Sequence, residues 1–122
     1  GVLVKDNHLA VLERAGLSLA QALAQARLRI PHPCKIEVEV ESPAQARLAL
    51  EAGADLLLLD NMSAEAMAEV VRFARGRALT EASGNMSLER VAAVAAAGVD
   101  FISVGALTHS APALDISLDF EA

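Results

Sequence analysis

The chain has 122 residues, of which 54% are hydrophobic and 21% charged, so it is long and apolar enough for one folded domain and is not a disordered chain. A net charge of −6 argues against a general nucleic-acid binder, although backbone N–H groups can still bind a single phosphate locally. Cys34 is the single cysteine, and no apolar run approaches the about 18 residues of a membrane span, so we expect a cytoplasmic protein that does not enter a membrane.

The first third of the chain predicts a strand, a helix and a second strand. Val2-Leu3-Val4 is typical of the end of a buried strand, and Lys5-Asp6-Asn7-His8 of the loop after it. A helix is predicted over about 17–30, where a Pro-His-Pro sequence ends it. Ile36 to Glu41 alternates strictly between apolar and acidic residues, as a strand does. A domain rarely begins one residue before a core strand, so we expect further residues upstream of Gly1.

Three further helices are each predicted to begin at a capping serine and to end at a glycine. These pairs are Ser42–Gly53, Ser63–Gly76 and Ser87–Gly98. Pro43 suits a first helical position, and Gln45 can close a capping box. The predicted strands between and after these helices are Leu56–Leu59, about 77–82 and about 100–104.

The ends of the strands recur at a regular interval. Glu39, Asp60, Ser83 and Gly105 are 21, 23 and 22 residues apart, and the Ala-Gly-x-Asp turn at 52–55 recurs at 97–100. This period predicts successive βα units and a parallel sheet of five strands. We expect an α/β fold, a partial (β/α) barrel of about five parallel βα units, with an open sheet of the flavodoxin type as the alternative. Both folds bind ligands at the carboxyl ends of their strands.

Two acidic residues at these ends are candidates for chemistry. Glu39 lies in a strand that we expect to be covered on both faces, where a carboxylate is costly unless a cation or donors meet it. Glu37 and Glu41 share its face, so a solvent-facing edge strand is the alternative, and Glu41 is assigned to the following loop. Asp60 ends the most apolar strand, where a turn or cap residue is the alternative. Glu39 and Asp60 together suit a magnesium–diphosphate site, because Mg²⁺ keeps several waters and uses few protein ligands.

Two consecutive loops predict an anion site. Ser83-Gly84-Asn85 lies between a strand and a helix, where glycine lets the backbone approach an anion and the helix N-terminus favours negative charge. Gly105-Ala106-Leu107 follows the next strand and can supply a second set of N–H groups. Ordinary turn chemistry is the alternative for each loop alone.

One basic residue joins these candidates. Lys5, at the end of the first strand, is placed to bind a phosphate or a carboxylate. Its neighbour His8 is given no catalytic role, and Cys34 is given none either. The later His109 could contact phosphate, and a structural role in a turn is the alternative. The histidines and the cysteine lack the spacing of zinc ligands.

Five motifs in order carry a family resemblance. They are Lys5-Asp6-Asn7-His8, Glu37-Val38-Glu39-Val40, Leu58-Leu59-Asp60-Asn61-Met62, Glu81-Ala82-Ser83-Gly84-Asn85 and Val104-Gly105-Ala106-Leu107-Thr108-His109-Ser110. Together with the ending Ala113–Phe120, they resemble the C-terminal part of the quinolinate phosphoribosyltransferase family, also called nicotinate-nucleotide pyrophosphorylase (carboxylating). The resemblance covers essentially the whole chain.

The resemblance implies a reaction of NAD biosynthesis. Quinolinate and phosphoribosyl pyrophosphate give nicotinate mononucleotide, pyrophosphate and CO2, with Mg²⁺ as the cofactor. By this resemblance, Lys5 looks like the lysine that contacts substrate and phosphate. Glu39 and Asp60 look like the carboxylates that face the ribose and the Mg²⁺-diphosphate, directly or through water. The loops at 83–85 and 105–107 look like the loops that bind the 5′-phosphate.

Family members are longer than this chain and dimeric. Residues 1–122 thus resemble the C-terminal portion of the barrel catalytic domain, without the N-terminal domain and the early barrel strands. We expect the chain alone to be inactive and the complete protein to be a homodimer. The alternatives are another phosphate-binding barrel enzyme, an isomerase or an aldolase with Lys5 as a Schiff-base lysine, and a non-catalytic barrel fragment.

Overall fold

The computed structural model describes residues 1–109 and 111–120. Strands and helices alternate along it, with one additional helix near the start. The strands are β1 (Val2–Val4), β2 (Ile36–Val40), β3 (Leu56–Asp60), β4 (Leu79–Ser83) and β5 (Phe101–Ile102). The helices are α1 (Asp6–Arg14), α2 (Leu19–Arg29), α3 (Pro43–Glu51), α4 (Ala64–Ala74), α5 (Leu88–Ala96) and α6 (Ala106–His109).

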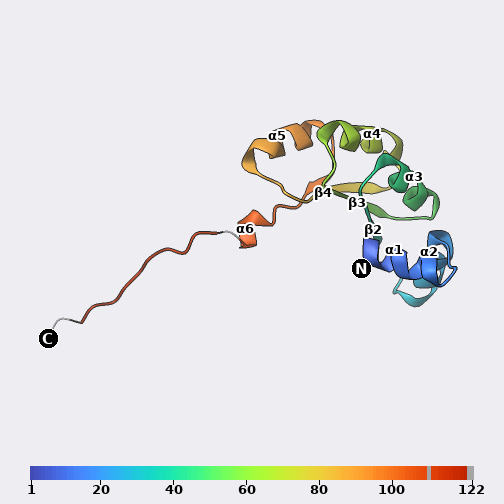
Figure 1. Cartoon of the computed structure of the whole chain (residues 1–122), viewed down its shortest axis with the longest axis horizontal. Coiled ribbons are helices and arrows are strands. Elements are labelled where there is room, and N and C mark those ends of the chain that lie inside the picture. Colours follow the sequence, from blue (N-terminus) through green and yellow to red (C-terminus); the bar gives the residue numbers. More distant parts are fainter. Residues whose placement is uncertain (110, 121–122) are drawn as a thin grey trace.

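The five strands form one parallel sheet in the order β1-β2-β3-β4-β5. Figure 1 shows α3, α4 and α5 in an arc outside β2, β3 and β4. A flavodoxin-type sheet instead places its second strand outside its first and wraps helices on both faces. The sequential order therefore confirms the predicted partial α/β barrel and excludes the flavodoxin alternative.

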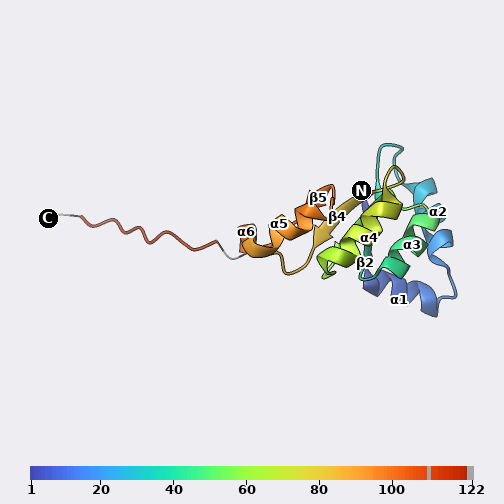
Figure 2. The ribbon, with the colours of Figure 1, turned by 90° about the horizontal axis from the view of Figure 1, so that it is seen from above.

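Within the described residues, helices α2 to α5 pack against one face of this sheet (Figure 2). The strand residues on that side belong to the buried core: Ile36, Val38, Val40, Leu57, Leu59 and Ala82. The residues that alternate with them are half-buried or exposed, and Phe101 is 50% exposed. The expectation that these strands are covered on both faces is therefore wrong for the described chain. In a barrel, the second face points to the interior, and that is the face that carries the acidic side chains of β2.

The predicted helix caps are largely observed. Ser42 and Ser63 accept the backbone N–H of Gln45 at 3.3 Å and of Ala66 at 3.2 Å. The Gln45 side chain accepts the N–H of Glu41 at 2.7 Å, so it does not form the predicted capping box with Ser42. The predicted glycines follow the ends of α3, α4 and α5 with positive φ angles, namely Gly53, Gly76 and Gly98. Ser87 occupies the cap position of α5 without a side-chain cap bond.

The structure differs most from the prediction directly after β1. Asp6-Asn7-His8, predicted as a loop, forms the first turn of α1. His8 Nδ1 accepts the backbone N–H of Lys5 at 2.9 Å, and Asp6 Oδ1 accepts that of Asn7 at 2.6 Å. These two bonds satisfy N–H groups that a helix start leaves unpaired, which lets a polar run begin a helix. The helix predicted over 17–30 is observed as α2.

The repeated Ala-Gly-x-Asp turn has a structural role at the amino ends of the strands. Asp55 Oδ2 accepts the backbone N–H of Ile36 at 2.7 Å, at the start of β2. Asp100 Oδ2 accepts the N–H of Thr80 at 2.8 Å, near the start of β4. Each aspartate lies just before its own strand and bonds to the strand that precedes it, so the turn fastens successive units together.

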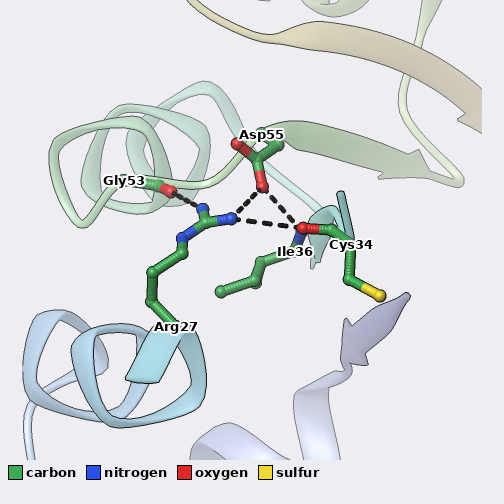
Figure 3. Close-up of polar contacts among 5 residues, drawn as sticks. All are labelled: Arg27, Cys34, Ile36, Gly53 and Asp55. Carbon is green, nitrogen blue, oxygen red and sulfur yellow. Dashed lines mark hydrogen bonds and ion pairs between the residues drawn. The ribbon is translucent and has the colours of Figure 1, made fainter. Parts of the chain in front are cut away.

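Arg27 of α2 strengthens the first of these turns (Figure 3). Its guanidinium lies 2.7 Å from Asp55 Oδ2 and donates to the Gly53 carbonyl at 3.1 Å and the Cys34 carbonyl at 3.5 Å. Burial raises the pKa of Asp55, but the hydrogen bonds from Arg27 and Ile36 and the charge of Arg27 outweigh that effect. The net pKa lies below its ordinary value, and Asp55 is therefore an anion at neutral pH.

Candidate active site

All the predicted site residues lie where strands end. Lys5 directly follows β1. Glu39 is the second-to-last residue of β2, and Asp60 is the last residue of β3. Ser83 ends β4, and Gly105 lies between β5 and α6. In a parallel sheet the carboxyl ends share one edge, which is where barrel enzymes place their sites. The fold thus brings the predicted residues to the same edge of the sheet.

Glu39 carries a buried atom without a partner. Its Oε2 is shielded from solvent, and within the described residues no hydrogen-bond donor meets it. Burial raises the pKa of Glu39 above its ordinary value; the Lys5 ammonium lowers it, and the Asp60 carboxylate raises it. A covered carboxylate oxygen without a donor is costly, and a cation or a ligand donor would satisfy it.

Two more carboxylates lie on the same face of the sheet. Burial raises the pKa of Glu37, and the charges of Glu81 and Glu39 raise it further. Glu81 also accepts a hydrogen bond from the Ser103 hydroxyl. Glu81 was not among the predicted site residues; the strand register identifies it, because Leu58 pairs with Glu39 on one side and with Glu81 on the other.

The loops after β3 and β4 are joined by a chain of side-chain amides. Asn61 Nδ2 donates to Asp60 Oδ2 at 2.7 Å, and Asn85 Nδ2 donates to Asn61 Oδ1 at 2.9 Å. The backbone N–H of Asn61 donates to the Ser83 carbonyl at 3.1 Å. Both asparagines have positive φ angles, 53° for Asn61 and 46° for Asn85, a conformation that asparagine adopts more readily than most residues. Asn61 was not among the predicted site residues.

Gly84 lies against this chain of amides. Its φ is +79°, and a Cβ atom there would be 2.4 Å from Asn61 Oδ1 and 2.7 Å from Asp60 Oδ1. Within the described residues, no hydrogen bond uses the backbone N–H of Gly84 or of Asn85. The loop therefore keeps two donors at the predicted anion site.

Arg90 of α5 holds both loops. Its guanidinium donates to the carbonyls of Met62 at 3.1 Å, Asn85 at 3.0 Å and Gly84 at 3.4 Å. One side chain thereby fixes the loop after β3 relative to the loop after β4. The position of Arg90 in the first turn of a helix does not indicate these contacts, so the sequence did not predict them.

The second predicted anion loop continues into α6. Leu107 is 75% exposed, and its N–H donates to the Val104 carbonyl at 3.2 Å. The Gly105 carbonyl accepts the N–H of His109 at 2.9 Å. Leu107 thus uses its N–H inside the turn, which leaves Gly105 and Ala106 as the backbone donors of this loop.

The described residues do not form a complete metal cage. Among them, no three or more His, Cys, Asp or Glu side chains are arranged to hold a metal ion.

None of the helices in the described ranges has both the length and the apolar character that crossing a membrane requires.

A model of the family "quinolinate phosphoribosyl transferase, C-terminal domain" matches residues 1–119. This chain belongs to that family. The family predicted from the five motifs is thereby confirmed, and so is the assignment to its C-terminal part.

Curated relatives and solved structures agree with this membership. The chain is 40% identical over 119 residues to a probable nicotinate-nucleotide pyrophosphorylase (carboxylating) of Bacillus subtilis, covering 98% of this chain and 40% of that protein. It is 46% identical over 122 residues to a protein of the same description from Archaeoglobus fulgidus, covering 96% of this chain and 45% of that protein. The crystal structure of NadC from Streptococcus pyogenes superposes with a TM-score of 0.77 at 39% identity, covering 98% of this chain and 41% of that one. The chain therefore spans less than half the length of these relatives.

Proposed function

We propose that the complete protein containing this chain transfers a phosphoribosyl group from phosphoribosyl pyrophosphate to quinolinate. The products are nicotinate mononucleotide, pyrophosphate and CO2. One observation carries the proposal: within the described residues no hydrogen-bond donor meets the buried Oε2 of Glu39, and the charges of Lys5 and Asp60 both act on this carboxyl group. Membership of the family supports quinolinate and phosphoribosyl pyrophosphate as the substrates.

The proposed reaction exchanges one bond at C1′ of the ribose for another. The bond from C1′ to the pyrophosphate oxygen breaks with its electron pair, and the ring nitrogen of quinolinate forms a bond to C1′. The carboxylates of Glu39 and Asp60 stabilise the positive charge that develops on the ribose. Lys5 holds an anionic group of the substrate, and the N–H groups of Gly84 and Asn85 bind the 5′-phosphate. The ring then loses one carboxyl group as CO2, and a proton replaces it.

We propose Mg²⁺ as the cofactor, held by Glu39 and Asp60 directly or through water. Mg²⁺ commonly binds through one or two carboxylates together with substrate phosphates, so two carboxylates without a complete cage fit it. The buried Oε2 of Glu39, which no donor among residues 1–109 and 111–120 meets, also fits a cation. When bound, the ion neutralises charge on the leaving pyrophosphate.

The proposal has two further parts, a homodimer and a cytoplasmic location. The proposed homodimer rests on the family resemblance, and a cytoplasmic location rests on composition and the single cysteine. Sedimentation of the complete protein tests the dimer.

Replacement of one carboxylate tests the proposed reaction. In the complete protein, Asp60→Asn keeps the size of the side chain and removes its charge. We expect the Kd for phosphoribosyl pyrophosphate in the presence of Mg²⁺ to rise at least about tenfold, the scale of one charge-assisted contact. Titration calorimetry measures this Kd, and release of CO2 reports turnover.

The matched control is Glu51→Gln, which removes one charge from an exposed residue at the end of α3. The carboxyl end of α3 leads toward the amino end of β3, away from the proposed site. The control should bind and turn over as the unaltered protein does. Unchanged affinity and turnover in Asp60→Asn would remove Asp60 from the mechanism.

A further inference from the structure

Asn61 lies between the two parts of the proposed site. On one side it bonds to Asp60, the proposed metal and ribose carboxylate, and on the other to Asn85, in the proposed phosphate loop. We propose that Asn61 is a positioning residue, which sets the orientation of Asp60 according to the position of the phosphate loop. The inference rests on the proposed function and extends it to a residue that does not itself contact substrate.

The two hydrogen bonds allow only one orientation of the Asn61 amide. Its nitrogen must face Asp60, because a carboxylate only accepts, and its oxygen must face the donor Nδ2 of Asn85. A flip of the amide would place oxygen against oxygen on one side and nitrogen against nitrogen on the other. Asp60 therefore keeps a donor on Oδ2, and its other oxygen, Oδ1, lies beside Gly84.

The backbone holds the same residue in place. Asn61 has a φ of 53°, and its N–H donates to the Ser83 carbonyl, so its main chain is tied to β4 as well. The space beside its side-chain oxygen is occupied by the Gly84 backbone, at which even a Cβ atom would come within 2.4 Å. A shift of the phosphate loop is consequently passed to Asn61 through three contacts and from Asn61 to Asp60.

The substrate explains why such a link matters. Phosphoribosyl pyrophosphate carries a 5′-phosphate on one side of its ribose and a pyrophosphate at C1′ on the other. Groups that bind the two ends must be held at one separation, because small errors in placement reduce the rate strongly. Asn61 joins the groups proposed for each end.

The test uses the complete protein and titration calorimetry with phosphoribosyl pyrophosphate at a series of Mg²⁺ concentrations. The main variant is Asn61→Gly, since glycine adopts the same positive φ without strain and only the amide is lost. We expect the Mg²⁺ concentration for half-maximal binding to rise about 10- to 100-fold, the usual range for losing a residue that orients a metal ligand. The melting temperature should change little. In steady-state assays with phosphoribosyl pyrophosphate varied at saturating Mg²⁺, we expect kcat to fall more than KM rises.

A double-mutant cycle separates this role from a merely structural one. Asn85→Ala should also raise the Mg²⁺ requirement, because it removes the donor that orients Asn61. In the Asn61→Gly background, Asn85→Ala should raise that requirement no further, since the link is already broken. Asn61→Asp should raise it more than Asn61→Gly does, because it sets a second carboxylate against Asp60.

Three outcomes would overturn the inference. An unchanged Mg²⁺ requirement in Asn61→Gly, or fully additive effects in the double variant, would do so while leaving the proposed function standing. Failure of the unaltered complete protein to bind phosphoribosyl pyrophosphate with Mg²⁺ would overturn both.

Discussion

At the scale of single residues, Gly84 is constrained both by its backbone conformation and by its place in the proposed phosphate site. Its φ of +79° disfavours any side chain, and the side chains of Asn61 and Asp60 fill the space where a Cβ would lie. Its N–H group is at the same time one of the proposed phosphate donors. A single methyl group there affects conformation and site together.

We predict that Gly84→Ala in the complete protein weakens the binding of phosphoribosyl pyrophosphate at least about tenfold and lowers stability by about 1–2 kcal/mol. The methyl group must displace the amide of Asn61, and with it Asp60, while alanine is strained at a positive φ. Titration calorimetry and thermal unfolding measure the two effects.

Gly53→Ala is the matched control for this prediction. Gly53 has a φ of +92°, but nothing lies within 4 Å of a Cβ built there. This variant should lose a similar amount of stability and bind the substrate normally. If both variants bind equally well, the contact at Gly84 does not matter for the site.

At the scale of helices and strands, Asp55 connects three elements. It lies directly before β3, pairs with Arg27 of α2 and accepts the N–H of Ile36 in β2. We predict that Asp55→Asn lowers the free energy of unfolding by about 1–2 kcal/mol at pH 7, because it loses charge-assisted hydrogen bonds to a half-exposed arginine. The pKa of Asp55 is depressed in the folded protein, so its contribution is present above the pKa of the unfolded chain, about 3.9. That contribution is lost as the pH falls through the folded pKa. The difference between variant and unaltered protein should therefore shrink toward zero in acid.

Denaturant unfolding of both proteins between neutral pH and strongly acidic pH checks this dependence. The control is the ion pair of Arg47 and Glu69, in which Nη2 of Arg47 lies 3.3 Å from Oε1 of Glu69. Their side chains are 53% and 44% exposed. Glu69→Gln should change stability by no more than about 0.5 kcal/mol, as expected of a solvent-screened pair. A constant difference for Asp55→Asn down to acid pH would contradict the assigned role of its charge.

Regular elements were predictable where local chemistry decides them. Ser42 and Ser63 are capping serines, and Gly53 is one of the glycines that follow a helix, so these boundaries follow from neighbouring residues alone. The start of α1 did not follow, because His8 bonds back to the N–H of Lys5 in a polar run that is also typical of a loop. The open face of the sheet followed only in part. The strict alternation of Ile36–Glu41 left a strand with one open face as an alternative, whereas the wholly apolar Leu56–Leu59 looks the same whether one face or both are covered.

The candidate site was predictable to the same extent. The period near 22 residues placed Glu39, Asp60 and Ser83 at strand ends, and the structure has them there. Asn61 and Arg90 were missed because their roles come from contacts between loops, 24 residues apart for Asn61 and Asn85. No local pattern encodes such contacts.

At the scale of the whole molecule, one face of the sheet carries Glu37, Glu39 and Glu81, and no helix among the described residues packs over it. Leu3, Leu79 and Phe101 are 38%, 41% and 50% exposed on it. Barrel enzymes assemble their sites from the ends of many strands, and five strands supply only part of such an edge.

We therefore predict that the isolated 122-residue chain forms no nicotinate mononucleotide from quinolinate and phosphoribosyl pyrophosphate. A steady-state assay with Mg²⁺ measures product, circular dichroism verifies that the chain is folded, and the complete protein serves as the positive control. Turnover by the folded chain would show that its five strands are sufficient.

The sequential order of the strands has a consequence for how the protein folds. Each strand pairs with the next one along the chain, so paired residues such as Glu39 and Leu58 are 19 positions apart, and Leu58 and Glu81 are 23 apart. Pairing with the next strand along the chain keeps these separations shorter than pairing out of sequence order would, and a shorter connection costs less entropy to close. Each βα unit can join the sheet soon after it leaves the ribosome, when the unit before it is already in place. Assembly in this direction would add the proposed site groups one strand at a time, from Lys5 to Gly105.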